Sequence, residues 1–168
     1  MKRILILTIF IVISFAQEIA PTFFLRDVNG ENFFASNIYG ENAKDPKTTV
    51  ISFSASWCGA CQNEIKALDS LAIKFPDIKF FLIDYKENEM NVKKWISKIK
   101  TKIPVLLDIY GLTAKKFGVE KKDENGKLKT NLPTLFIINK KGEIIYQHTG
   151  YKDEDAITLS EKLKSEKV

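Results

Sequence analysis

The sequence predicts an α/β protein in which helices flank a central mixed β-sheet. Three observations carry this prediction. Apolar, β-rich runs alternate with stretches of helical spacing, turn-forming residues separate these segments, and the chain closes with a hairpin and a helix. At 168 residues, 45% of them hydrophobic and 28% charged, the chain has the length and composition of one globular domain with a short appendage.

The appendage is the N-terminus, which has the pattern of a secretory signal. Two basic residues precede a short apolar run, and Ser14 and Ala16 put small side chains where a signal peptidase cuts. The run is much shorter than the roughly 20 residues that a membrane span needs. We therefore expect a signal peptide at 1–16, a folded domain at 17–168, and a periplasmic or other extracytoplasmic location. Membrane anchoring through an uncleaved signal is the alternative.

The charge pattern argues against a nucleic-acid partner. The chain has 26 Lys and Arg against 21 Asp and Glu, a formal net charge of +5. Lysines alternate with acidic residues, as on a solvated surface, and no basic run is interleaved with aromatic residues.

The first half of the domain contains a hairpin, a central strand and a helix. Short apolar runs on either side of Asn29-Gly30 predict a β-hairpin, and the polar residues 39–48 predict a loop. Residues 50–55 are almost all apolar, as in a strand buried on both faces. A helix is expected to follow from about residue 60 to residue 75, where Pro76 ends it.

The second half repeats strand and helix and then ends in a hairpin and a helix. The predicted strands are residues 78–84, 105–107, 135–138 and 144–146, and the predicted helices are residues 87–100, 112–117 and 153–164. The charged run 120–130 has Asn125-Gly126 in its middle, so it is either a hairpin or a mobile loop. We favour a surface insertion there.

The only two cysteines, Cys58 and Cys61, lie where the central strand turns into the helix. A dithiol exchange needs one thiolate that attacks and a second thiol that resolves the mixed disulfide. The helix N-terminus favours negative charge, so Cys58 is expected to attack and Cys61, within the first turn and less exposed, to resolve. A disulfide that closes so small a ring stabilises a fold little, which makes chemistry the better explanation of the pair.

Two other interpretations of the pair fit the sequence less well. A buried, inert cysteine pair fits poorly with a position next to Trp57 at a helix start. A metal site needs further ligands, and the chain offers only one histidine, His148, and no third cysteine. We therefore expect no cofactor and no resident metal, while transient copper(I) capture by the dithiol stays open.

The stretch from Trp57 to Glu64 resembles the active-site segment of thioredoxin-fold proteins. The longer pattern is similar to the secreted TlpA/ResA/CcmG-type thiol–disulfide oxidoreductases. Four blocks carry this resemblance in the expected order: residues 20–23, 57–64, 103–119 and 131–142. The resemblance implies a thioredoxin-like fold with an N-terminal β-hairpin extension.

The resemblance also implies roles for individual residues. Cys58 matches the nucleophile and Cys61 the resolving thiol. Pro133 matches a cis-proline that faces the disulfide, an uncommon bond that usually has a structural reason. Together with Trp57 it would form the substrate site, where the backbone of Leu132 would hydrogen-bond an extended substrate strand.

Glu64 matches an acidic residue near the active site of this subfamily. It is expected either to shuttle protons to or from Cys61 or to be a solvated helix carboxylate. Thioredoxin proper has a buried aspartate in the preceding strand, but this chain has Ser52 there, so no proton-transfer role is assigned to that position. Ala60 stands where many relatives have proline, and the reduction potential is therefore not transferable.

The function that this resemblance implies is an extracytoplasmic reductase of protein disulfides, kept reduced by a membrane electron donor. Its substrates would include apocytochrome c thiols before haem attachment, or a copper-site assembly protein. A disulfide oxidant or isomerase is the second enzyme hypothesis. A copper(I)-binding or client-binding module is the alternative from a different class.

Overall fold

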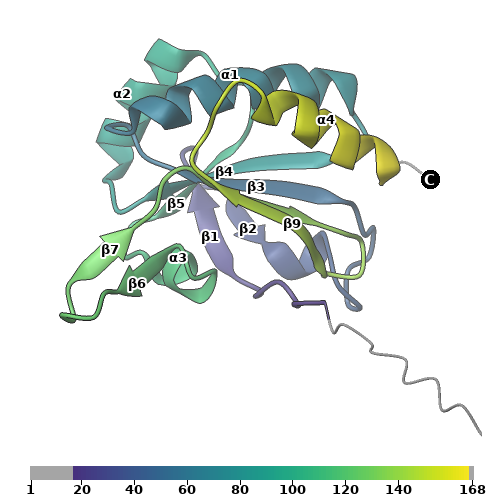
Figure 1. Cartoon of the computed structure of the whole chain (residues 1–168), viewed down its shortest axis with the longest axis horizontal. Coiled ribbons are helices and arrows are strands. Elements are labelled where there is room, and N and C mark those ends of the chain that lie inside the picture. The colour runs from purple at the N-terminus through teal and green to yellow at the C-terminus, as the bar shows by residue number, and fades with distance from the viewer. Residues whose placement is uncertain (1–16, 167–168) are drawn as a thin grey trace, which may run out of the picture.

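The computed structural model describes residues 17–166, and the predicted signal peptide at 1–16 lies outside them. Seven strands form one mixed sheet, shown in Figure 1. Their spatial order is β2 (Asn32–Phe34), β1 (Phe24–Asp27), β5 (Val105–Asp108), β4 (Lys79–Tyr85), β3 (Thr49–Ser54), β8 (Thr134–Ile138) and β9 (Ile144–Thr149). Strands β3, β4 and β5 run parallel, and the other pairs are antiparallel. The predicted mixed sheet and N-terminal hairpin are confirmed.

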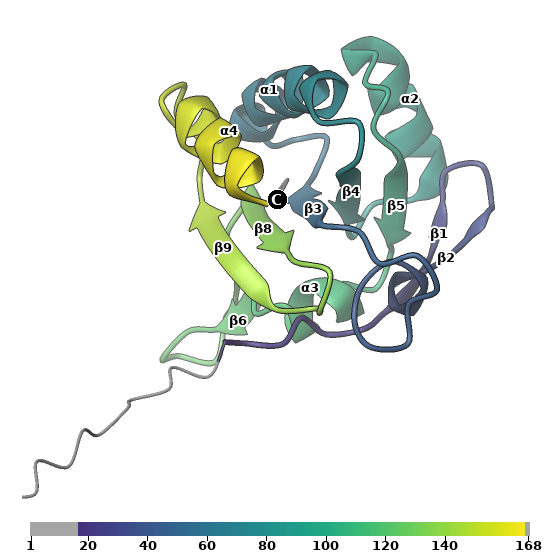
Figure 2. The same cartoon turned by 90° about the vertical axis from the view of Figure 1, so that its right-hand side faces the viewer.

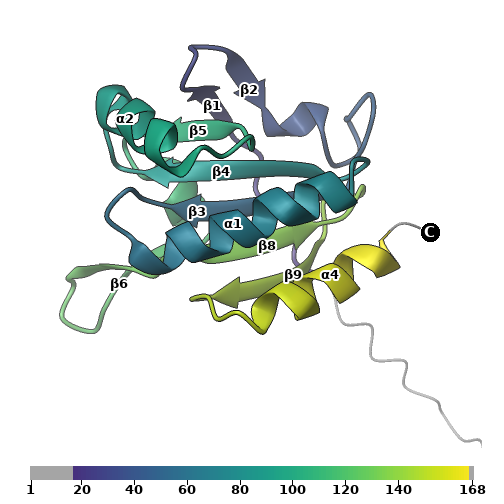
Figure 3. The same ribbon diagram turned by 90° about the horizontal axis from the view of Figure 1, so that it is seen from above.

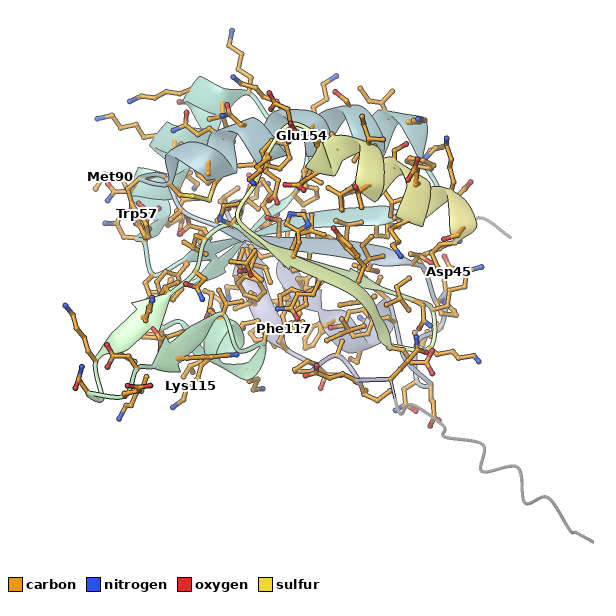
Figure 4. All side chains as sticks on the ribbon, in the orientation of Figure 1. Asp45, Trp57, Met90, Lys115, Phe117 and Glu154 are labelled. Atoms are coloured by element: carbon orange, nitrogen blue, oxygen red, sulfur yellow. A yellow bond between two sulfur atoms is a disulfide. The ribbon has the colours of Figure 1, made fainter. Side chains whose placement is uncertain are left out.

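Helices lie on both faces of the sheet. Figures 2 and 3 show α1 (Gly59–Lys74), α2 (Glu89–Ile99) and α4 (Asp155–Ser165) on one face, and Figure 2 shows α3 (Leu112–Lys116) on the other. The α1 face buries a mainly aliphatic cluster that includes Leu68, Leu82 and Leu159. The α3 face is rich in aromatic residues, and Phe117 lies among them below the sheet in Figure 4.

The central strand β3 positions the site. All six of its residues are buried because β4 and β8 pair with its two edges and helices cover both faces. Successive side chains of a strand point to opposite faces. Ile51 and Phe53 pack into the aromatic cluster, so Ser52 and Ser54 point toward the helices. Two buried hydroxyl groups therefore lie beneath α1 and its neighbours.

Helix α1 presents one buried stripe that contains a carboxylate. The stripe consists of Cys61, Glu64, Ile65, Leu68 and Leu71, the spacing of a helix with one core-facing side. The helix ends at Lys74, close to the predicted end, because Pro76 disfavours helical backbone in the residue before it.

The remaining boundaries differ from the predictions by a few residues. A short 3-10 helix, Ala35–Asn37, was not expected. The charged run forms a second, two-stranded sheet of β6 (Glu120–Lys122) and β7 (Leu128–Thr130), so the hairpin alternative holds there. Within residues 17–166 no helix is both long and apolar enough to cross a membrane.

Candidate active site

The two cysteines form a disulfide at the first turn of α1. Their Cα atoms are 5.3 Å apart. Cys58 is the N-cap of the helix, with extended backbone, and its sulfur accepts a hydrogen bond of 3.2 Å from the backbone N–H of Cys61. Such a donor also stabilises the thiolate when the disulfide is open. Cys58 is 7% exposed and Cys61 is fully buried, in the order that the sequence predicted.

The segment that contains Pro133 folds against the cysteines. The Leu132–Pro133 peptide bond is cis, as expected. The Leu132 side chain packs against the small cluster of Ala55 and the two cysteines. The fold therefore brings together two segments more than 70 residues apart. Substrate binding by Leu132 and Pro133 stays a prediction.

Trp57 projects from the surface next to the disulfide. Its exposed fraction is 65%, and the nearby Met90 is 75% exposed. Figure 4 shows both side chains at the end of the molecule where α1 begins. The substrate role of Trp57 stays a prediction.

Glu64 is fully buried, one helical turn after Cys61. It follows Cys61 by three residues, so the two side chains lie on the same face of α1. Ser52 Oγ donates a hydrogen bond to Glu64 Oε2, and His148 Nε2 lies 3.0 Å from Glu64 Oε1. The alternative of a solvated helix carboxylate is wrong, because the apolar stripe of α1 turns this residue toward the sheet.

The sequence indicated His148 only as a possible metal ligand. It did not predict the contact of His148 with Glu64. Strand β9 extends to Thr149, three residues beyond its predicted end, and this extension puts His148 inside the sheet. Residues two apart in a strand point to the same face of the sheet, so the spacing of Tyr146 and His148 is the sequence pattern that could have placed the imidazole on the helix face.

A second buried carboxyl group lies at the end of β4. Asp84 and Ser54 are Cα partners in the β3–β4 ladder, and both are fully buried. No partner among residues 17–166 makes a well-oriented hydrogen bond to either Asp84 oxygen or to Ser54 Oγ. Burial, and then the nearby Glu87 carboxylate, raise the pKa of Asp84 to about 8. Asp84 is therefore mainly protonated at neutral pH.

The β6–β7 hairpin is fixed to the end of β4. Tyr85 and Lys86 both donate hydrogen bonds to the Glu120 carboxylate, and Thr130 Oγ1 donates to Tyr85 Oη at 2.9 Å. Figures 1 and 3 show the hairpin projecting from the end of the molecule where α1 begins. Because β7 ends two residues before Leu132, this network also fixes the approach to the cis-proline.

The described part of the chain holds no group of three or more His, Cys, Asp or Glu residues arranged to bind a metal ion. The site thus combines a disulfide that packs against Ala55 and Leu132 with the buried Glu64 carboxyl group, which has two hydrogen-bond partners.

A reactive cysteine pair at the start of the helix after the central strand, packed against a cis-proline segment, defines the thioredoxin-like class of thiol–disulfide oxidoreductases, and this chain is one of them. A family model described as the AhpC/TSA family matches residues 16–147, and the chain belongs to that family.

Named relatives agree with this class. The chain is 26% identical over 147 residues to the thiol-disulfide oxidoreductase ResA of Bacillus thuringiensis subsp. konkukian, covering 86% of this chain and 75% of the relative. It is 27% identical over 120 residues to the sporulation thiol-disulfide oxidoreductase A of Bacillus subtilis, covering 67% of each. The crystal structure of a putative thiol:disulfide interchange protein DsbE from Chlorobium tepidum superimposes with a TM-score of 0.75 at 21% identity, covering 89% of this chain and 95% of that one.

Proposed function

We propose that the protein is an extracytoplasmic reductase of protein disulfides. The observation that carries this proposal is the buried carboxylate of Glu64 on the same helix face as the buried sulfur of Cys61. A carboxylate at this place can take the proton of Cys61 when Cys61 attacks the mixed disulfide, and can return it when the exchange runs in the other direction. The reducing direction is proposed from the resemblance to the TlpA/ResA/CcmG group.

The proposed reaction has two displacement steps. The Cys58 thiolate attacks one sulfur of the substrate disulfide, forms a mixed disulfide and releases the first substrate thiolate. Cys61 then gives its proton to Glu64 and attacks the Cys58 sulfur, which releases the second substrate thiolate and forms the Cys58–Cys61 disulfide. The substrate gains two electrons, and the released thiolates take up protons from water or from Glu64.

The return to the dithiol consumes two electrons and two protons. A membrane electron donor is the proposed source, because the N-terminal sequence predicts export and the relatives include ResA. Apocytochrome c thiols and copper-site assembly proteins are the proposed substrates, on the basis of the resemblance to the TlpA/ResA/CcmG group.

Two matched cysteine variants test the proposal. Cys58→Ser should abolish reduction of insulin and of an oxidised apocytochrome peptide. Cys61→Ser should keep the first attack and accumulate a mixed disulfide with the same peptide, detectable by mass spectrometry. Reduction at the wild-type rate by Cys58→Ser, or a mixed disulfide that forms on Cys61, would contradict the assignment.

A further inference from the structure

Glu64 lies above a row of three residues that crosses the sheet. Ser52 of β3 is the Cα partner of Leu135 in β8, and Leu135 is the Cα partner of His148 in β9. Cross-strand partners point to the same face, so all three side chains point toward the helices. Ser52 and His148 reach Glu64 of α1 from the two ends of this row, with Leu135 between them.

Ser52 and His148 each contact one oxygen atom of the Glu64 carboxylate. Ser52 donates to Oε2, and the His148 ring nitrogen contacts Oε1. The Glu64 side chain is 0% exposed, whereas that of His148 is 13% exposed. A buried carboxylate keeps its charge only where donors replace the lost water. Ser52 and His148 therefore replace water around the Glu64 carboxylate, and of these two side chains that of His148 is partly exposed.

We propose that His148 is a positioning residue, whose Nε2–H donates to Glu64 Oε1 and holds the carboxylate in place to accept the proton of Cys61. This proposal rests on the function proposed above. In the step itself the Cys61 proton moves to Glu64, and His148 keeps its own proton. Removal of the imidazole donor leaves Oε1 buried without that partner, so the carboxylate is no longer held in place and proton transfer from Cys61 slows.

Several other ionisable groups surround this pair. The Tyr146 ring packs edge-on against His148 at 5.6 Å, and Lys162 of α4 lies over the Tyr146 ring. Burial, and then Asp155 of α4, raise the pKa of Tyr146. Burial, and then Asp153, Glu64 and Asp155, raise the pKa of Tyr151 in the loop after β9. Both tyrosines are therefore neutral between about pH 5 and pH 8, where the effect of His148 is measured.

The test separates the two steps of exchange with dithiobis(nitrobenzoate). Attack by Cys58 releases the first nitrothiobenzoate, and attack by Cys61 on the resulting mixed disulfide releases the second. His148→Leu should slow the second release about tenfold or more near pH 6.5 and move its acid limb up by about one pH unit or more. The first release should stay within about twofold of wild type at each pH.

His148→Gln is the rescue variant, because its amide N–H reaches about as far as Nε2 and should restore the second release to within about threefold of wild type. Gln147→Leu, at an exposed position one residue earlier, is the control and should match wild type. If His148→Leu does not fold, His148→Asn takes its place, since its amide is too short to reach Oε1. The proposal is overturned if His148→Leu, or His148→Asn in its place, keeps the wild-type pH dependence of the second release. It is also overturned if His148→Gln does not restore the rate of that release. A wild-type protein without any second release overturns the proposed function instead.

Discussion

Glu64 and Asp84 both have fully buried carboxyl groups, but the two groups differ in their hydrogen-bond partners. Each is fully buried, and each has a serine of β3 near it, Ser52 for Glu64 and Ser54 for Asp84. Glu64 has a partner at both oxygens, whereas Asp84 has no well-oriented partner within residues 17–166. Burial and the nearby Glu87 carboxylate thus make Asp84 mainly a neutral acid at pH 7, while two partners equip Glu64 to act as a base.

The largest expected effect separates the two carboxyl groups by function. Glu64→Gln should slow the attack of Cys61 by about 10²–10⁴-fold, the usual contribution of a general base. Asp84→Asn should change the same rate by less than about threefold, because a neutral acid that stays neutral accepts no proton. Stopped-flow measurement of the second nitrothiobenzoate release decides the question. If the second release were slower in Asp84→Asn than in Glu64→Gln, Asp84 rather than Glu64 would be the functional carboxyl group.

The next effect concerns stability and pH. Folding raises the pKa of Asp84 from 3.8 to about 8, so between these values the folded state holds a proton that the unfolded state has lost. The free energy of unfolding should therefore fall as pH rises from about 4 to about 8. Asp84→Asn removes this loss. We expect the free energy of unfolding of this variant to exceed that of wild type by at least about 3 kcal/mol near pH 8.

Urea unfolding of both proteins across this pH range measures that difference. The advantage of Asp84→Asn should shrink as pH falls and disappear near pH 3, below the unfolded-state pKa of 3.8, where the wild-type carboxyl group is mainly protonated in both states. A difference that does not change with pH would show that Asp84 is already ionised in the folded protein.

The smallest effect compares the two serines. Ser52→Ala removes a hydrogen bond to a buried carboxylate and should cost about 1.5–3 kcal/mol of unfolding free energy at pH 7. Ser54→Ala removes a buried hydroxyl without a hydrogen-bond partner and should leave stability unchanged or raise it by up to about 2 kcal/mol. Both variants lose one oxygen atom from the same strand, so each controls for the other. Equal losses would mean that Ser54 has a partner after all.

The sequence was sufficient for the features that depend on local pattern. The alternation of apolar runs predicted the order of the elements, and the Asn29-Gly30 turn predicted the N-terminal hairpin, where Gly30 adopts a φ of 85°. The position of Cys58 at the N-cap followed from the strand-to-helix boundary. The resemblance to a known family added the cis bond at Pro133, which residue spacing alone would not have indicated.

The sequence was insufficient where function depends on tertiary contacts. Glu64 and His148 are 84 residues apart, and no local pattern links a helix residue to a strand residue at that distance. Asp84 lies at the end of what the sequence predicts as an ordinary strand, and its raised pKa arises from burial and from the nearby Glu87 carboxylate. Buried polar groups of this kind become visible once packing decides which side of each element faces inward.

The reduction potential of the Cys58–Cys61 couple tests the central claim, that this protein is a reductant, most directly. It can be measured by equilibration of the purified protein with glutathione or dithiothreitol buffers and alkylation of free thiols. The proposed function predicts a value near that of thioredoxin, about −270 mV. A value near about −120 mV, as in a strong disulfide oxidant, would contradict it.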